Sequence, residues 1–552
     1  MEPAKLRDDI LRRWTSLDNE RQEFMSLWED LSDVFIPNAG RFGKRRKGRN
    51  LREKYRRMLT DRQRRAVNVM AAGMQAGMAS PARRWFTLQG SLPTYTQSQS
   101  GKMWFDYNTD NMFAMFGRSN IYRALHTMYQ EMGVFGPAAA IVVPDYYSVI
   151  RAHTLTIGEY ALGQDENGDI DTLYREFDMT VGQMVKAFGK DNVSKTVKNL
   201  YDSNNLDEWI TILHAIEPRR ERIITRRDNM NMPWRSVYLE KDGESSKILS
   251  ESGFPLFPVI TARWDVTSND VYPDSPGMQA LGNVRNLFLN ERRMGQAMDQ
   301  LYNPALQVPL GITDVNTLPG GITRVDNMQN TGIRRTYEIN IDPSWLRENS
   351  REIEDRINSA FFVDMFLMIS SRIDRTMTAT EVASLSEEKL MVIGPTHSRM
   401  QQELYSKLIE ISFFYMQEAG LIPPPPQELQ GMPMRVEFTS MMAQAMKASE
   451  VNTTDRFVQG VINVAGAKPE VLDKIDADRL VDAYADMLGV TPELLADEET
   501  VRAIREQRAQ AQAAAQEQAA MQQQAAMAKE LSQADMSGDN ALTGLLSQFQ
   551  GY

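Results

Sequence analysis

The chain contains no cysteine, and this absence excludes disulfides, thiolate metal sites and cysteine nucleophiles together. Histidine is almost as scarce, because only four are present and no two are spaced i, i+4. Scattered histidines are ordinary surface or core residues far more often than metal ligands. The sequence therefore predicts no metal centre and no cofactor. The four are His126, His153, His214 and His397.

Long apolar runs and nucleotide-binding motifs are also missing. The longest apolar candidate, Phe361 to Ile369, carries Asp364 and is far shorter than the ~18 residues of a membrane span. The charged start, Met1 to Asp9, does not resemble a signal peptide. No P-loop, dinucleotide fingerprint or Gly-x-Ser-x-Gly elbow occurs. We expect a protein that is made in a cytoplasm, is not an enzyme and has no membrane partner.

What the chain does have is length and an uneven charge. Its 552 residues are 42% hydrophobic and 24% charged, a globular composition that suits several domains. The net charge is −11, but thirteen Lys or Arg face two acidic residues between Arg41 and Arg65. This basic belt carries +11, so the remainder of the chain carries −22. An acidic remainder repels nucleic acid, whereas the belt attracts phosphates or an acidic partner. Its candidate residues are Lys44, Arg45, Arg46, Lys47, Arg49, Arg52, Arg56 and Arg57.

The first half of the chain mixes helical and strand patterns in separate blocks. Helical spacing predicts helices over residues 8–35, 61–78 and 102–133, while residues 140–143 and 154–157 look like strands. The turn signal at residues 165–168 predicts a hairpin, and residues 180–201 are rich in helix signals. A second β group is predicted at 210–216, 222–226, 235–239 and 248–251. Residues 1–275 therefore form an α+β body.

Two long helices dominate the centre of the chain. The first is expected over residues 276–302, with its apolar stripe at Leu281, Val284, Phe288, Gly295, Met298 and Tyr302. The second, over residues 343–369, buries Leu346, Ile353, Ile357 and Phe361. The insert between them has strand-like pieces at 306–308, 322–325 and 337–341, and it is too small to bury a core alone.

Beyond the second long helix, the sequence predicts a new helix start and then a mostly helical region. Thr378 and Glu381 have capping-box spacing, so a helix starts at Thr378. Gly394-Pro395 breaks or kinks it, a further helix continues to Ala419, and residues 435–439 look like a strand. Helices follow from Met442. Residues 500–531, rich in Ala and Gln, are either disordered or a long helix that needs neighbours.

Short motifs along most of the chain carry a family resemblance, which is specific through their order and spacing over residues 10–430. The chain resembles the head-to-tail connector, or portal protein, of short-tailed phages. One departure is Pro273, where this family commonly has glycine after tyrosine. The matching motifs are Trp14, Arg21 and Trp28; Pro37-x-x-Gly40-Arg-Phe42; Ala72-Gly-Met74; Ser80-Pro81; Trp85-Phe86; Arg263-Trp264; Tyr272-Pro273-x-Ser275-Pro276; Ala280-Leu281; Thr378-Ala-Thr-Glu-Val382; and Gly394-Pro395.

The resemblance implies a predominantly helical α+β subunit of a twelve-membered ring around a channel for double-stranded DNA. It implies docking of the terminase large subunit and later of tail adaptor or tail tube proteins, contacts with capsid and scaffolding proteins, and a place in the virion. The implied regions are a wing (1–275), stem helices (276–304 and 343–369), a clip (305–342), a tunnel loop with the start of the next helix (370–394), a wing return (395–441), a crown or barrel (442–531) and a flexible tail (532–552).

For such a channel the acidic residues of the second long helix are the candidate wall. Attraction between phosphates and Lys or Arg would act as drag on DNA, so an acidic wall suits a conduit. Candidates for facing the channel are Glu348, Glu352, Asp355, Arg372 and Arg375. A rival interpretation is a nucleic-acid-binding protein that acts through the basic belt, although the belt lacks interleaved aromatics apart from Phe42 and Tyr55.

Overall fold

The fold of this chain comes from a computed structural model that describes most of its length. The residues described are 3–42, 51–90, 99–226, 228–243, 248–308, 315–316, 333–335, 343–371, 393–431, 434–440, 458–461, 463, 480–481 and 498–533. They mix helices and strands with helix predominating, and the strands gather in separate blocks, which confirms the α+β prediction at that level.

Helices from the first quarter of the chain form the centre of the body. Helix α1 (Pro3–Val34) is one continuous helix, and α3 (Arg62–Met78) packs on α5 (Ile121–Phe135). The helix predicted over residues 102–133 is in fact two, α4 (Gln99–Arg118) and α5, because the chain turns at Ser119 and Asn120. Most methionines and aromatic rings of these helices lie in one large apolar core, as their spacing predicts, whereas Met103 and Tyr107 of α4 are exposed.

A three-stranded antiparallel sheet packs against α5. Its order is β3-β2-β9, from β2 (Pro137–Asp145), β3 (Val149–Leu155) and β9 (Val259–Arg263). Strand β9 was not predicted, since prolines punctuate its surroundings, yet all five of its residues are buried. Because the strand is buried on both faces, its sequence is a short run of mostly apolar residues and does not alternate between apolar and polar.

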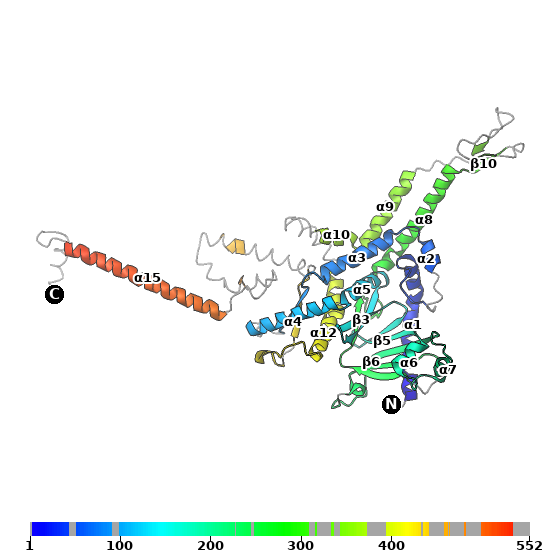
Figure 1. Cartoon of the computed structure of the whole chain (residues 1–552). Helices are drawn as coiled ribbons and strands as arrows, with labels where there is room; N and C mark the ends of the chain where they lie inside the picture. The colour runs from blue at the N-terminus through cyan, green and yellow to red at the C-terminus, as the bar shows by residue number, and fades with distance from the viewer. Residues whose placement is uncertain are drawn as a thin grey trace.

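A five-stranded antiparallel sheet completes the body, in the order β4-β5-β6-β7-β8. The predicted hairpin is confirmed, because Asp165 Oδ1 accepts hydrogen bonds from the amides of Asn167 and Asp169 at 2.9 Å and Gly168 has φ +85°. Residues 222–226, predicted as a strand, are instead an exposed turn region, because their arginines offer no face to bury. The strands are β4 (Tyr160–Gln164), β5 (Ile170–Thr180), β6 (Trp209–Pro218), β7 (Trp234–Glu240) and β8 (Ser250–Phe254), and α6 (Val181–Phe188) and α7 (Lys195–Asp202) lie beside them (Figure 1).

The chain returns to the body after residue 393. Residues 393–400 are helical, a π-helical segment follows at Gln401–Ser406, and α12 (Lys407–Glu418) ends near Gly420, which has φ +70°. Strand β12 (Met434–Phe438) then pairs antiparallel with β1 (Phe86–Gly90), joining Phe86 to Phe438. This pairing confirms the strand predicted at 435–439 and ties the two halves of the chain together.

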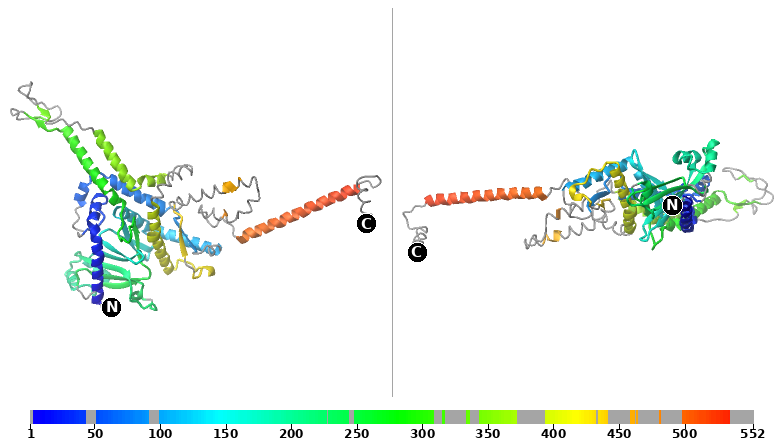
Figure 2. Two further views of the ribbon diagram at one scale, coloured as in Figure 1. Left: turned by 180° about the vertical axis from the view of Figure 1, so that it is seen from behind. Right: turned by 90° about the horizontal axis from the view of Figure 1, so that it is seen from below.

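Two features project from the body. Helices α8 (Pro276–Tyr302) and α9 (Pro343–Ala360) leave it side by side, with β10 (Leu306–Gln307) paired to β11 (Arg334–Arg335) at their far end (Figure 1). Helix α15 (Glu498–Gln533) lies apart from the body in both views of Figure 2. Residues 500–531 are therefore helical, whereas the predicted need of this helix for neighbours stays a prediction.

Candidate assembly and channel surface

Helix α8 starts at a capped, closely packed corner of the body. Ser275 Oγ accepts a hydrogen bond from the amide of Met278 at 3.1 Å and donates one to the carbonyl of Val134 at 2.8 Å. A Cβ on Gly277 would stand 2.4 Å from that carbonyl oxygen, so only glycine allows the approach. Serine followed by proline is a strong helix-start signal, and here the same serine also fixes the direction in which α8 leaves α5.

The α8–α9 pair is held by one apolar seam. The predicted seam residues are buried except Phe288, which is half-buried against the core. Gly295 and Tyr302, predicted on the α8 stripe, are exposed, and Leu287 is buried in their place. The predicted stripe was wrong at these outer positions. There α9 is the main neighbour of α8 and covers only one side of it, so Gly295 and Tyr302 stay exposed. The buried seam residues are Leu281, Val284, Leu346, Ile353, Ile357 and Phe361.

The acidic candidates lie together on the free face of α9. Glu348, Glu352 and Asp355 are all exposed, and their i, i+4, i+7 spacing places them opposite the buried seam. Arg356 pairs with Glu352 at 2.6 Å across exposed side chains. On another face, Arg62 of α3 pairs with Glu354 at 2.8 Å and fixes α9 to the body.

The second long helix is broken, which corrects the prediction of one helix over residues 343–369. Helix α9 ends at Ala360 and α10 (Val363–Ser371) begins after Phe362, whose φ is +55°. Phe361 is buried with its ring 5.5 Å from that of Phe35, and Phe362 lies 6.0 Å from Trp264. The rings of Phe361 and Phe362 thus pack in different parts of the body, and this packing turns the chain between α9 and α10. The sequence has no glycine or proline here to indicate a helix break.

The two described parts of the basic belt, residues 41–42 and 51–65, are both held to the body. The Arg41 amide donates to the Ile157 carbonyl at 2.8 Å, and the Gly40 amide donates to Thr156 Oγ1 at 2.7 Å. Farther along, α2 (Leu51–Arg57) is held to the end of α1 by a 2.6 Å ion pair between Lys54 and Asp33. Its remaining arginines, Arg52, Arg56 and Arg57, are exposed, and Arg57 pairs with Glu53.

A buried carboxyl group lies under this tether. Glu131 of α5 accepts hydrogen bonds from Thr156 Oγ1 at 2.7 Å and from the Ile157 amide at 3.2 Å. Burial raises the pKa of Glu131 to about 7, and the two hydrogen bonds oppose that shift only in part. The belt therefore begins beside a carboxyl group that titrates near neutral pH.

Sequence reasoning missed a buried ion pair in the body. Arg263 at the end of β9 contacts both carboxylate oxygens of Glu403, at 2.7 and 3.1 Å, and donates to the Gly168 carbonyl at 2.9 Å. Arg263 and Glu403 are both buried, and Glu403 belongs to the π-helical segment. An arginine directly after an apolar run was the available signal.

Several predicted residues lie outside the part that the structure describes. These are Lys44, Arg45, Arg46, Lys47, Arg49, Arg372, Arg375, Thr378 and Glu381, together with the strand-like pieces at 322–325 and 337–341 and the tail from residue 534 onward. Among the residues described, no group of His, Asp or Glu is placed to hold a metal ion. Likewise, no described helix is long and apolar enough to cross a membrane.

A packed α+β body that projects a helix pair with charged free faces suits a structural subunit of an assembly. The chain belongs to the bacteriophage head to tail connecting protein family, whose model matches residues 7–495. This match confirms the resemblance drawn from the short motifs and gives the chain the role of a head-to-tail connector at the capsid vertex.

Two relatives match nearly end to end. The chain is 46% identical over 546 residues to the "Probable portal protein" of Bordetella phage BPP-1, with 98% of each chain covered. It is 37% identical over 543 residues to the "Portal protein" of Salmonella phage epsilon15, again with 98% of each covered. A chain from the virion of the native gene transfer agent particle aligns with a TM-score of 0.33 at 9% identity, over 78% of this chain and 94% of that one, too low to support conclusions about the fold.

Proposed function

We propose that copies of this chain assemble into a closed ring, of the twelve subunits that the resemblance implies, around a channel for double-stranded DNA. The observation that carries this proposal is the α8–α9 pair, which buries one seam and leaves an acidic face free on α9. A closed head-to-tail ring needs two unlike complementary faces on each copy, and a projecting helix pair offers two sides for them.

In this ring the regions take the following places. Residues 1–275 and 395–441 form the wing, α8 and α9 the stem, residues 305–342 the clip, 370–394 the tunnel loop and its helix, and 442–531 the crown or barrel. The clip docks the terminase large subunit during packaging and tail adaptor or tail tube proteins afterwards. The wing contacts capsid and scaffolding proteins, and the assembled ring resides in the virion.

The acidic face of α9 lines the channel in this proposal. Carboxylates repel phosphates, so DNA slides past Glu348, Glu352 and Asp355 without binding them. Arg347 and Arg351 are also exposed and Arg356 pairs with Glu352, so the free surface of α9 combines a stripe of three carboxylates with flanking arginines. Arg372 and Arg375 are proposed to face the channel at the tunnel loop.

The test replaces Glu348, Glu352 and Asp355 by Lys in the full chain. We expect rings of unchanged size by negative-stain imaging and native mass measurement, with slower, more salt-dependent DNA packaging, because each new cation attracts phosphate. A matched control reverses three exposed acids of the body, Asp191, Asp207 and Glu208, and should package normally. Unchanged packaging by the α9 variant would exclude its face from the channel wall, and a monomeric wild type would contradict the ring.

A further inference from the structure

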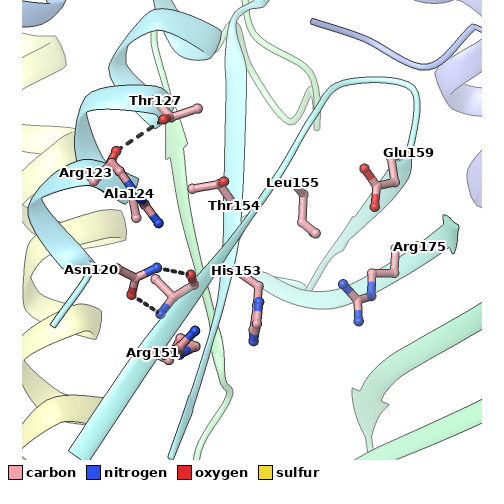
Figure 3. Close-up of a pocket in the computed structure, with 11 residues that line it drawn as sticks. Asn120, Arg123, Ala124, Thr127, Arg151, His153, Thr154, Leu155, Glu159 and Arg175 are labelled. Atoms are coloured by element: carbon pink, nitrogen blue, oxygen red, sulfur yellow. Dashed lines mark hydrogen bonds between the residues drawn. The ribbon is translucent and has the colours of Figure 1, made fainter. Parts of the chain in front are cut away.

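A polar hollow of about 400 Å³ opens between α5, β3 and β5 (Figure 3). Arg123 reaches it from α5, Arg151 and His153 from the outer face of β3, and Arg175 from β5. Glu159, in the turn before β4, is the carboxylate among its lining residues. We call this feature the arginine hollow.

The arginine hollow carries positive charge that the described chain leaves uncompensated. Arg123 is exposed and has no ion pair among the described residues, and Arg151 reaches Asp145 only at 3.6 Å with more than half of its side chain exposed. Arg175 uses its Nε to donate to His214 Nδ1 at 3.1 Å and lies 4.4 Å above the ring of Phe177, which leaves its other nitrogens for a ligand.

The two remaining titratable groups do not cancel this surplus. Burial and the neighbouring Arg175 and Arg151 lower the pKa of His153, so the ring is neutral at neutral pH and adds no charge. Burial raises the pKa of Glu159 against the opposing effect of Arg175 and Arg41. One carboxyl group therefore faces three guanidinium groups.

The geometry restricts what can enter. Strand β3 is the edge of its sheet, but Asn120 caps it, because Asn120 Nδ2 donates to the Ala152 carbonyl at 2.7 Å and the Ala152 amide donates to Asn120 Oδ1 at 2.9 Å (Figure 3). An added strand is thus blocked at this position. The volume of about 400 Å³ has room for a side chain but is far too small to receive duplex DNA. A side-chain carboxylate fits, since guanidinium forks bind carboxylates through paired hydrogen bonds.

We propose that the arginine hollow receives a carboxylate side chain from the neighbouring copy of this chain. The inference rests on the proposed ring, in which every copy offers one surface to the next and receives a different one. Charge complementarity favours a second copy as the occupant, because the chain outside the basic belt carries −22 and this hollow is a local reversal of that sign.

The absence of an amine on arginine makes a direct test possible. Carbodiimide joins an amine to a carboxylate in contact with it but leaves arginine unmodified, so Arg123→Lys introduces a reactive group into the arginine hollow. Rings assembled from equal amounts of isotopically light and heavy chains are cross-linked and digested, and mass spectrometry identifies the peptides joined. We expect a light-to-heavy cross-link from position 123 to one Asp or Glu.

A control and a second variant complete the test. Arg220→Lys places the same amine on an exposed residue outside the hollow and should give at most a tenth of that cross-link. The double reversal Arg123→Glu with Arg151→Glu should raise the concentration for half-assembly by about tenfold or more at moderate salt, with monomer melting unchanged.

The outcomes separate the two proposals. Rings that form normally, with position 123 joined only to Glu159 or Asp145 of its own copy, would overturn the arginine hollow and leave the ring intact. A cross-link from position 123 to a scaffolding or capsid protein, but not to a second copy, would also overturn it. Failure of the wild-type chain to form rings would overturn both proposals.

Discussion

The core of the body and the outer part of the α8–α9 pair differ in how far their aromatic side chains are buried. In the body, Trp28, Tyr129 and Phe135 are fully buried within one copy. At the outer part of the helix pair, Trp345 is 65% exposed and Tyr302 is 84% exposed. The core of the body is complete within one copy, whereas the exposed rings of the helix pair are available to neighbouring copies in the proposed ring.

Ion pairs show the same contrast. Arg263 and Glu403 are buried and hold β9 to the π-helical segment through several hydrogen bonds. Arg356 and Glu352 on α9 are each about 60% exposed and share one contact of 2.6 Å. Water screens the second pair but not the first. Removing one partner should therefore lower the free energy of unfolding more for the buried pair than for the exposed pair.

The largest expected effect therefore comes from breaking the buried pair. Glu403→Ala leaves Arg263 buried without its partner and should lower the free energy of unfolding by about 3–5 kcal/mol. Glu352→Ala, its control on α9, should cost at most about 0.5 kcal/mol because its partner stays solvated. Denaturant titration of dilute, unassembled protein measures both. Equal losses would show that the body and the projection are stabilised alike.

A second effect is confined to the body and depends on pH. The pKa of Glu131 is raised from 4.5 to about 7 in the folded chain, so the unfolded chain loses this proton first as pH rises. Its contribution to stability is therefore present below about pH 4.5 and is lost between pH 4.5 and 7, by up to about 3 kcal/mol. Melting temperature followed from pH 5 to 8 should fall accordingly.

The matched variant for this effect is Glu131→Gln, which removes the titration and keeps one acceptor for Thr156 or Ile157. Its melting temperature should vary less with pH, and the gap between variant and wild type should shift in favour of the variant as pH rises. Parallel curves for the two proteins would show that Glu131 does not govern the pH dependence of the body.

Two glycines in long helices provide a test with a smaller effect. Replacing each by alanine should change the free energy of unfolding in opposite directions. A Cβ on Gly73 of α3 would stand 2.3–2.5 Å from the Phe366 side chain, so Gly73→Ala should destabilise by about 1–3 kcal/mol. Gly295 of α8 has nothing within 4 Å of its Cβ position, so Gly295→Ala should stabilise by up to about 1 kcal/mol. Thermal unfolding of the two monomers decides. Losses of similar size at both positions would contradict the open surroundings of α8.

The sequence predicts those parts of the fold that depend on local signals and misses those that depend on contacts between distant residues. Periodicity and caps are local signals, so α1, α3, α8 and the hairpin at Asp165 to Gly168 were predicted close to their observed positions. The break at Phe361 and Phe362 has no local signal, since it arises from Phe35 and Trp264 far away in the sequence. Strand β9 and its ion pair to Glu403 likewise depend on partners that only folding brings near.

The candidate channel surface was predictable in part. Helical spacing alone placed Glu348, Glu352 and Asp355 on one face, and the structure exposes that face. The exposure of Gly295 and Tyr302 was not predictable, because it depends on where the body ends along α8. The arginine hollow was missed altogether, since its arginines come from three separate elements and no spacing connects them.

The smallest expected effect comes from removing α15 by ending the chain after Asp497. Described side chains from Arg502 to Ala526 are exposed, and alanine supports the helix without a partner to pack on. All eight tryptophans precede this point, so their fluorescence reports on the body and the α8–α9 pair and not on α15. The thermal midpoint of the unassembled protein by this fluorescence should change by less than about 1 °C, while far-ultraviolet circular dichroism loses a long helix. A drop of several degrees would mean that α15 packs on the body of its own copy. An unchanged monomer with less stable rings would place the partner of α15 on other copies.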